Sequence, residues 1–313
     1  MSSARAPVWA IGLFGLVVLA LLPVPLVASA YLISFLVLLF LSVGLAASWN
    51  LISGYTGYTS FGHAGFFGLG SYVAALLVFY WRFPWVVACA AAGLFAFAVA
   101  LAVGWPTLRL RGPYFAIAML GLSEVARIFV TIWDQVTRGG LGVYLPAPED
   151  PGPAYYWSLA VAVLAVALTY AVASSALGMR LMAIREDEPA AEANGIATTR
   201  HKLFAFSVSA VFPGVLGGLY AYHFAYIDPG TVFSVSWSIR AIVMTMFGGA
   251  GTVVGPVLGS VLLTTISEAV WAQNPFLYQV LFGLMLVVVV LFMPGGLIVL
   301  FQRRGWLPRA RWL

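Results

Sequence analysis

The chain has 313 residues, of which 63% are hydrophobic and only 8% are charged. Soluble globular domains carry about 25% charged residues, so this composition excludes a water-soluble globule. The net charge of +5 is spread along the chain, which argues against a nucleic-acid partner. The single cysteine, Cys89, allows neither an internal disulfide nor a cysteine-based metal cluster. We therefore expect an all-α polytopic protein whose surroundings are a lipid bilayer.

Long apolar segments recur along the whole chain, and about 20 such residues cross a bilayer as a helix. The expected spans are roughly 8–28, 31–49, 64–81, 85–104, 113–133, 155–177, 203–226, 239–271 and 276–301. Allowing for an interrupted segment, they predict about 9–10 transmembrane or re-entrant helices. We expect residues 1–313 to form a single transmembrane domain.

The positions of the basic residues predict the orientation, because cytoplasmic loops carry an excess of Arg and Lys. Basic side chains occur in the 105–112 connection, in the 178–202 segment and in the tail 302–313, whereas the 134–154 connection is acidic and rich in proline. The first three should be cytoplasmic, together with both termini. The 239–271 segment must then enter and leave on the outer side, as two shorter helices or a re-entrant pair.

The N-terminal apolar run permits two interpretations. Arg5, the run itself and the Ala28-Ser29-Ala30 sequence resemble a signal peptide with its cleavage site. However, the run is longer than a usual signal core and contains Pro23 and Pro25. We favour a retained first span.

Two glycine-dense segments interrupt the apolar pattern. The first, residues 53–70, mixes glycine with polar and aromatic side chains, and the second contains Gly251, Gly255 and Gly259. Glycines spaced in this way let helices approach closely, but breaks in both halves of a transporter can mark a substrate path. We expect packing at the second segment and a pathway role at the first. The candidate pathway residues there are Tyr55, Tyr58, Ser60 and His63.

Glu124 and Arg127 lie three residues apart in the expected 113–133 span, so they share a helical face and can pair. Glu124 is about 16 Å along the helix from Pro113, close to the middle of the bilayer. Ionisable residues at this depth are costly and informative. We expect a structural ion pair buried between helices; the alternative is a gating or pathway element.

The polar segment 178–202 stands out between apolar segments, and it contains the makings of a short helix. Asp187 or Glu188 can cap the first turn, Pro189 suits the first helical position, and Asn194-Gly195 is a stop signal. A short capped helix beside a membrane is suited to docking onto a soluble protein. The candidate docking residues are Arg185, Glu186, Asp187, Glu188, Ala190, Ala191, Glu192 and Gly195.

Enzyme chemistry is poorly supported by the sequence. No group of His, Asp and Glu has the spacing of metal ligands or of a catalytic centre. A phosphate-binding P-loop needs Gly-Lys followed by Ser or Thr, whereas the only lysine, Lys202, lies between His201 and Leu203. We expect no catalytic residues, no metal and no cofactor, so any ATP would be bound by another subunit.

Several ordered motifs resemble one family, the permease subunits of branched-chain amino-acid ABC importers, of the LivM type. The resemblance covers the chain from about Trp49 to Gly296. The motifs are WNLISGYTGYTSFGHAGFFGLGSY (49–72), LRLRGPYFAIAMLGLSEVAR (108–127), AIREDEPAAEANGI (183–196), KLFAFSVSAVFPGVLGGLYA (202–221), MFGGAGTVVGPVLGS (246–260) and MPGG (293–296).

The resemblance implies the fold of an ABC-importer permease in a bacterial inner membrane. It also implies four kinds of contact: a second, pseudo-symmetric permease, two cytoplasmic ATPases, an extracytoplasmic solute-binding protein and lipid. In such importers a Glu-Ala-Ala-x-x-x-Gly pattern docks on the ATPase. Here Ala190, Ala191 and Gly195 keep that spacing, but Pro189 separates Glu188 from the alanines.

Other classes remain open at this stage. An ion-coupled secondary transporter would need a buried carboxylate, for which Glu124 is the best candidate, and a membrane enzyme would need a convergent polar site that the sequence lacks. The substrate is also open, because relatives in this family carry branched-chain amino acids, amides, urea or aromatic acids.

Overall fold

The structure is a computed structural model that describes residues 8–110, 112–271, 283–284, 287 and 295–303. Seven segments of the described chain are long and apolar enough to cross a membrane. These are α3 (Ala30–Trp49) with the π-helix η1 (Asn50–Gly54), α4 (His63–Trp81), α5 (Trp85–Thr107), α6 (Pro113–Ile132), α8 (Gly152–Ala173), α11 (Thr198–Phe224), and α12 (Pro229–Val232) with α13 (Ser236–Gly248).

Shorter elements connect or flank these spans. They are α1 (Val8–Leu21), α2 (Val24–Val27), α7 (Asp134–Thr137), η2 (Gly139–Leu141), α9 (Ala176–Glu186), α10 (Glu188–Ala193), α14 (Val254–Trp271) and α16 (Gly296–Arg303). Two short strands, β1 (Val143–Tyr144) and β2 (Tyr226–Ile227), pair in antiparallel fashion, with Val143 opposite Ile227. The all-α polytopic class predicted from the sequence is confirmed.

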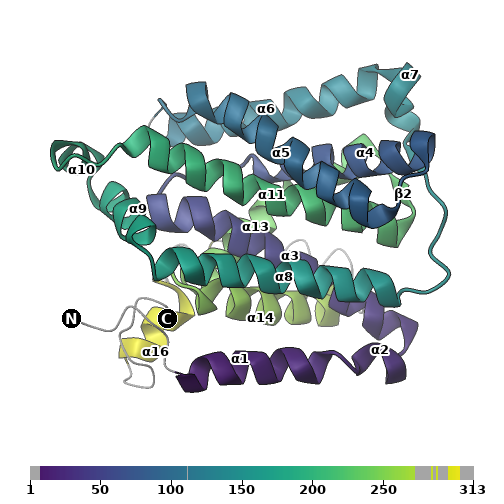
Figure 1. The fold of residues 1–313 in the computed structure, drawn as a ribbon, viewed down its shortest axis with the longest axis horizontal. Helices are drawn as coiled ribbons and strands as arrows, with labels where there is room; N and C mark the ends of the chain where they lie inside the picture. The colour runs from purple at the N-terminus through teal and green to yellow at the C-terminus, as the bar shows by residue number, and fades with distance from the viewer. Residues whose placement is uncertain (1–7, 111, 272–282, 285–286, 288–294, 304–313) are drawn as a thin grey trace.

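The long helices lie roughly parallel to one another, so the molecule has two ends (Figure 1). The helices α9, α10 and α16 lie at one end, which we call the α10 end, and α2, α7 and β2 lie at the other. The helix α11 runs through the centre, packed chiefly against α5 and α4, while α3 packs against α8. Edge-to-face aromatic pairs such as Phe66 with Phe206, whose ring centroids are 5.5 Å apart, fill the space between α4 and α11.

The expected first span, 8–28, is interrupted. The helix α1 has 14 residues, which reach about 21 Å, less than the roughly 30 Å of a hydrocarbon core. A turn at Leu22 and Pro23 separates it from α2, because proline removes a backbone donor and disfavours a continuous helix. Tyr155 of α8 donates a hydrogen bond to the carbonyl oxygen of Leu21 at 2.7 Å, so the end of α1 is attached to the bundle.

The break expected within 239–271 is present, between α13 and α14. The two helices pack against each other through glycine, as the sequence predicts: a Cβ at Gly259 would lie 1.9 Å from the carbonyl oxygen of Met244. Only glycine allows so close an approach of two backbones. The expected last span, 276–301, lies largely outside the described residues.

Candidate functional site

The polar segment forms a helical hairpin at the α10 end. The sequence predicted the short helix α10 and its cap: the Asp187 carboxylate accepts a hydrogen bond from the backbone N–H of Ala190 at 3.0 Å. Pro189 occupies the first turn, and Gly195 ends the segment with a φ of +80°. The preceding α9 was not predicted as a helix. Ser175 caps it by accepting a hydrogen bond from the N–H of Gly178.

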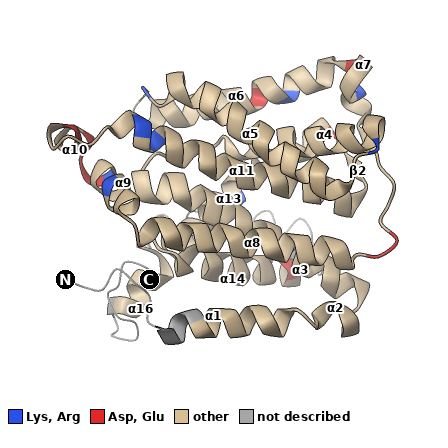
Figure 2. Ribbon diagram, viewed as in Figure 1, with Lys and Arg blue, Asp and Glu red and all other residues tan. Residues whose placement is uncertain are grey.

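One side of α10 is exposed and the other is attached to the bundle. Pro189, Ala190, Glu192 and Ala193 are exposed, whereas Ala191 is only 4% exposed. In Figure 2 the acidic colour gathers along α10, and basic colour lies on the neighbouring α9 and at the start of α11. The helix therefore presents a small, polar face beyond the end of the bundle.

The attachment of α10 centres on a buried ion pair. Lys202, at the start of α11, is 2% exposed, and its Nζ lies 2.5 Å from Oε1 of Glu188. Tyr58 of the first glycine-dense segment donates a hydrogen bond to Oε2 of Glu188 at 2.5 Å and accepts one from Nζ of Lys202 at 2.9 Å. The carbonyl oxygen of Leu108, in the α5–α6 connection, accepts a further bond from Nζ at 3.3 Å. Four parts of the chain meet at this cluster.

A second set of contacts joins α9 to both glycine-dense breaks. Nη1 of Arg185 donates a hydrogen bond to the carbonyl oxygen of Gly54 at 2.6 Å, at the end of the π-helix η1. The same guanidinium lies beside Gly251, where a Cβ would be 2.7 Å from Nη1. Gly251 has a φ of +83°, which favours glycine. The break between α13 and α14 therefore also lies at the α10 end.

Asn50 connects the two breaks directly. Its side chain is fully buried, and its amide nitrogen donates to the carbonyl oxygen of Thr252 at 2.7 Å. Its amide oxygen accepts from the backbone N–H of Gly251 at 2.8 Å. A buried amide with both ends bonded fixes the relative position of the two backbone segments. A movement of α9 and α10 can thus be transmitted, through Arg185 and Glu188, to both glycine-dense breaks.

The candidate pathway residues fall into two separate places. Tyr55, Ser60 and His63 are buried within this chain, at 1%, 0% and 0% exposure, and Tyr58 belongs to the ion-pair cluster. The 55–62 connection is held from inside, since the indole nitrogen of Trp49 donates to the carbonyl oxygen of Ser60 at 2.8 Å. Glu124 and Arg127 lie elsewhere, on α6.

The Glu124–Arg127 pair forms, as the spacing predicts, but the expectation that it is buried between helices is wrong for this chain. The two side chains are 48% and 37% exposed, because the buried residues of α6, Phe115, Met119 and Ser123 among them, lie on a different side of the helix. The acidic and basic colours on α6 lie part-way along its length in Figure 2.

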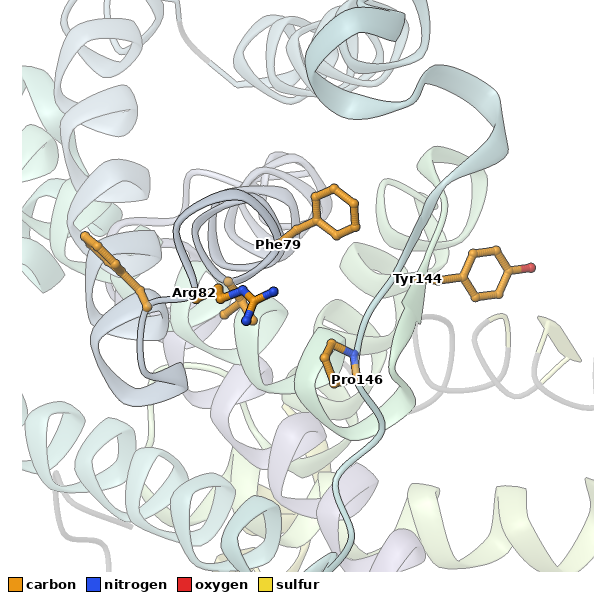
Figure 3. Close-up of a pocket in the computed structure, with 6 residues that line it drawn as sticks. Phe79, Arg82, Tyr144 and Pro146 are labelled. Carbon is orange, nitrogen blue, oxygen red and sulfur yellow. The ribbon is translucent and has the colours of Figure 1, made fainter.

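At the opposite end, a pocket with a volume of about 580 Å³ is bordered by Val78, Phe79, Arg82, Phe83, Tyr144 and Pro146. Phe79, Arg82 and Pro146 lie near one another in Figure 3, while the Tyr144 ring points away from them. Arg82 follows the last residue of α4 as its C-cap and has a left-handed φ of 52°. Arg138 lies over the Phe79 ring, 4.5 Å from its centroid.

Sequence reasoning missed three residues of the contacts that join α9 and α10 to the bundle, which we call the junction: Lys202, Asn50 and Leu108. Lys202 entered only as a basic residue of the 178–202 segment and in the exclusion of a P-loop. Asn50 was not considered, and Leu108 contributes only its backbone. A lysine that is alone in the chain and an asparagine inside an apolar run were available as signals, because both are costly at membrane depth unless partnered. Among the described residues, no group of three His, Cys, Asp or Glu side chains is placed to hold a metal ion.

The arrangement is that of a multi-pass membrane protein with a polar hairpin at one end. Residues 27–290 match the family described as branched-chain amino acid transport system / permease component, and the chain belongs to that family. The resemblance to branched-chain amino-acid ABC permeases of the LivM type is thereby confirmed.

Individual relatives agree with this assignment. The chain is 31% identical to the high-affinity branched-chain amino acid transport system permease protein LivM of Salmonella typhimurium, over 80% of this chain and 65% of that protein. It is 30% identical to LivM of Escherichia coli, over 85% and 69%, and 27% identical to LivH of Escherichia coli, over 81% and 90%. The matched region thus spans about two thirds of the LivM relatives. No solved structure matches the chain.

Proposed function

We propose that this chain is the permease subunit of an ATP-driven importer of branched-chain or related hydrophobic amino acids. In this proposal the 178–202 segment docks on a cytoplasmic ATPase, a second permease completes the transmembrane unit, and an extracytoplasmic protein delivers the substrate. ATP is bound by the partner subunits. The membrane is the bacterial inner membrane, with the α10 end and both termini on the cytoplasmic side.

The observation that carries the proposal is the double attachment of the α9–α10 hairpin. Glu188 binds Lys202 and Tyr58, and Arg185 binds the Gly54 carbonyl beside Gly251. A subunit that pushed on the exposed side of α10 would therefore act on both interrupted helices at once. The substrate class is taken from the LivM relatives, whose names state branched-chain amino acid transport.

The function can be tested by uptake of radiolabelled leucine into vesicles that contain this chain with the subunits that co-purify with it. We expect uptake to need internal-facing ATPases and ATP, to need a solute-binding protein, and to persist when an ionophore removes the proton gradient. Uptake driven by the proton gradient without ATP would instead support a secondary transporter.

Docking can be tested with Ala193→Trp, because Ala193 is exposed on α10 and a bulky ring there should clash only with a bound subunit. We expect the ATPases to be lost on purification while the abundance of this chain is unchanged. Ala147→Trp, an equally exposed alanine in the connection at the other end, is the matched control and should retain them. Full retention by both variants would contradict docking through α10.

A further inference from the structure

The helix α6 presents an unusual surface for a transmembrane segment. Only 22% of the residues in its 18-residue apolar stretch are buried, against 33–61% in the other six candidate spans. Its exposed side carries large apolar residues, including Ile117 at 66%, Val125 at 62% and Ile132 at 74%. On its own, such a surface would suit the hydrocarbon of a bilayer.

The Glu124–Arg127 pair makes lipid an unsuitable neighbour. Glu124 is 11 residues after Pro113, about 16 Å along the helix, which is about half of a bilayer core. The exposed fractions of 48% and 37% leave both charged groups unshielded by this chain. Charges at that depth are strongly unfavourable against acyl chains, and they occur where a protein or a polar cavity covers them. A protein surface or a polar cavity, rather than acyl chains alone, must therefore cover this side of α6.

We propose that the exposed side of α6, with the Glu124–Arg127 pair, packs against a second permease chain of the same fold. The inference rests on the proposed function, because it requires a permease pair. The branched-chain relatives include two permease types, LivM and LivH, and this chain matches both over more than three quarters of its own length. Two chains of one fold that pair about a pseudo-twofold axis present the same element to each other.

Local shape agrees with a helix of a partner at this place. Gly121 lies on the exposed side of α6, and a Cβ placed there would meet no atom within 4 Å, so a second backbone can approach closely. Val125, on the exposed side, borders a pocket of about 230 Å³ that lies between α4, α5 and α6, so this edge of the surface is open to an apolar side chain.

The helix α8 supplies a contrast within the same chain. It is of similar length, with 22 residues, and its sequence contains no charged side chain. Leu164, near the middle of α8, is 61% exposed. Because nothing polar accompanies it, we expect this side of α8 to face lipid. Ile128 on α6, 44% exposed, and Leu164 therefore form a matched pair of probe positions.

The test places the photo-reactive residue benzoylphenylalanine at either position, as Ile128→benzoylphenylalanine or Leu164→benzoylphenylalanine. The complex is purified through a tag on this chain, returned to lipid vesicles and irradiated, and the adducts are identified by mass spectrometry. We expect Ile128 to capture the second permease and Leu164 to capture lipid. Three results at Ile128 would overturn the assignment: adducts with lipid alone, capture of the solute-binding protein, or capture of another copy of this chain. Capture of the second permease from Leu164 instead of from Ile128 would also overturn it.

A second measurement follows the charge pair. Glu124→Gln leaves Arg127 unpaired at the interface, so the yield of the permease pair should fall several-fold, and adding Arg127→Met should restore much of it. The melting temperature of the separated chain should not change, because the pair is exposed there. An unchanged yield for Glu124→Gln would count against the inference. If no second permease co-purifies, the proposed function is overturned as well. If a stable pair forms but Ile128 gives only lipid adducts, only the inference about the α6 face is overturned.

Discussion

The ammonium group of Lys202 lies 2.5 Å from the Oε1 atom of Glu188, and Lys202, the only lysine of the chain, is 2% exposed. This contact joins the first turn of α10 to the start of α11. Tyr58 and the Leu108 carbonyl complete the coordination of the ammonium group. The cluster thereby connects the hairpin to the first glycine-dense segment and to the α5–α6 connection.

Removing one member of this pair should destabilise the protein. Lys202→Met removes the ammonium partner of the Glu188 carboxylate in a largely buried place, and breaking a buried pair costs about 3–5 kcal/mol. We expect a lower melting temperature in detergent and lower abundance in the membrane. The double variant Lys202→Met with Glu188→Gln, which removes both charges, should recover much of the loss. Equal melting temperatures for the single variant and the wild type would contradict a structural role.

Arg185 should matter for coupling more than for folding. Arg185→Met removes the hydrogen bond to the Gly54 carbonyl but leaves α9 and the cap of α10 intact. We expect normal abundance and bound ATPase with reduced leucine uptake per ATP hydrolysed. Arg180→Met is the matched control on the same helix, because Arg180 is exposed and pairs with the half-buried His201 rather than with either glycine-dense break. Equal coupling ratios in the two variants would remove Arg185 from the proposed connection.

Some of these features follow from local chemistry and could be predicted from the sequence. The α10 helix depends on Asp187, Pro189 and Gly195, whose roles are set by neighbouring backbone groups. The glycine-rich sequence between α13 and α14 likewise predicts the break between these two helices. The Glu124–Arg127 pair follows from helical spacing alone, but its exposure depends on which face the other helices cover.

The contacts that assemble the junction are long-range, and no local pattern indicates them. Asn50 and Gly251 are 201 positions apart, and Arg185 and Gly54 are 131 apart. The sequence around each of these residues does not indicate its partner, because the contacts form only when α3, α9 and α13 pack together. The helix α9 was not predicted for a different reason: its charged residues obscure the apolar pattern, although its apolar residues Leu181 and Ile184 are buried.

The packing role of the second glycine segment predicts a specific sensitivity. Gly259→Ala would place a Cβ 1.9 Å from the Met244 carbonyl oxygen, so α13 and α14 must separate. Overpacking of this kind costs about 1–3 kcal/mol, which should appear as a lower melting temperature. Gly140→Ala, where a Cβ meets nothing within 4 Å, should leave the melting temperature unchanged. A neutral Gly259→Ala would show that the two helices separate without cost.

The proposed orientation can be measured by labelling single cysteines with an impermeant maleimide, in a Cys89→Ala background. Asn194→Cys lies on the exposed end of α10, and Ala147→Cys lies in the exposed connection at the opposite end. Each cysteine can therefore react as soon as the maleimide has access to its side of the membrane. Thr198 would be unsuitable, because it is only 2% exposed and would stay unlabelled on either side. We expect Ala147→Cys to react in intact cells and Asn194→Cys to react only after the membrane is permeabilised. The reverse pattern would place α10 outside, where no ATPase could reach it, and the proposed docking would fail with it.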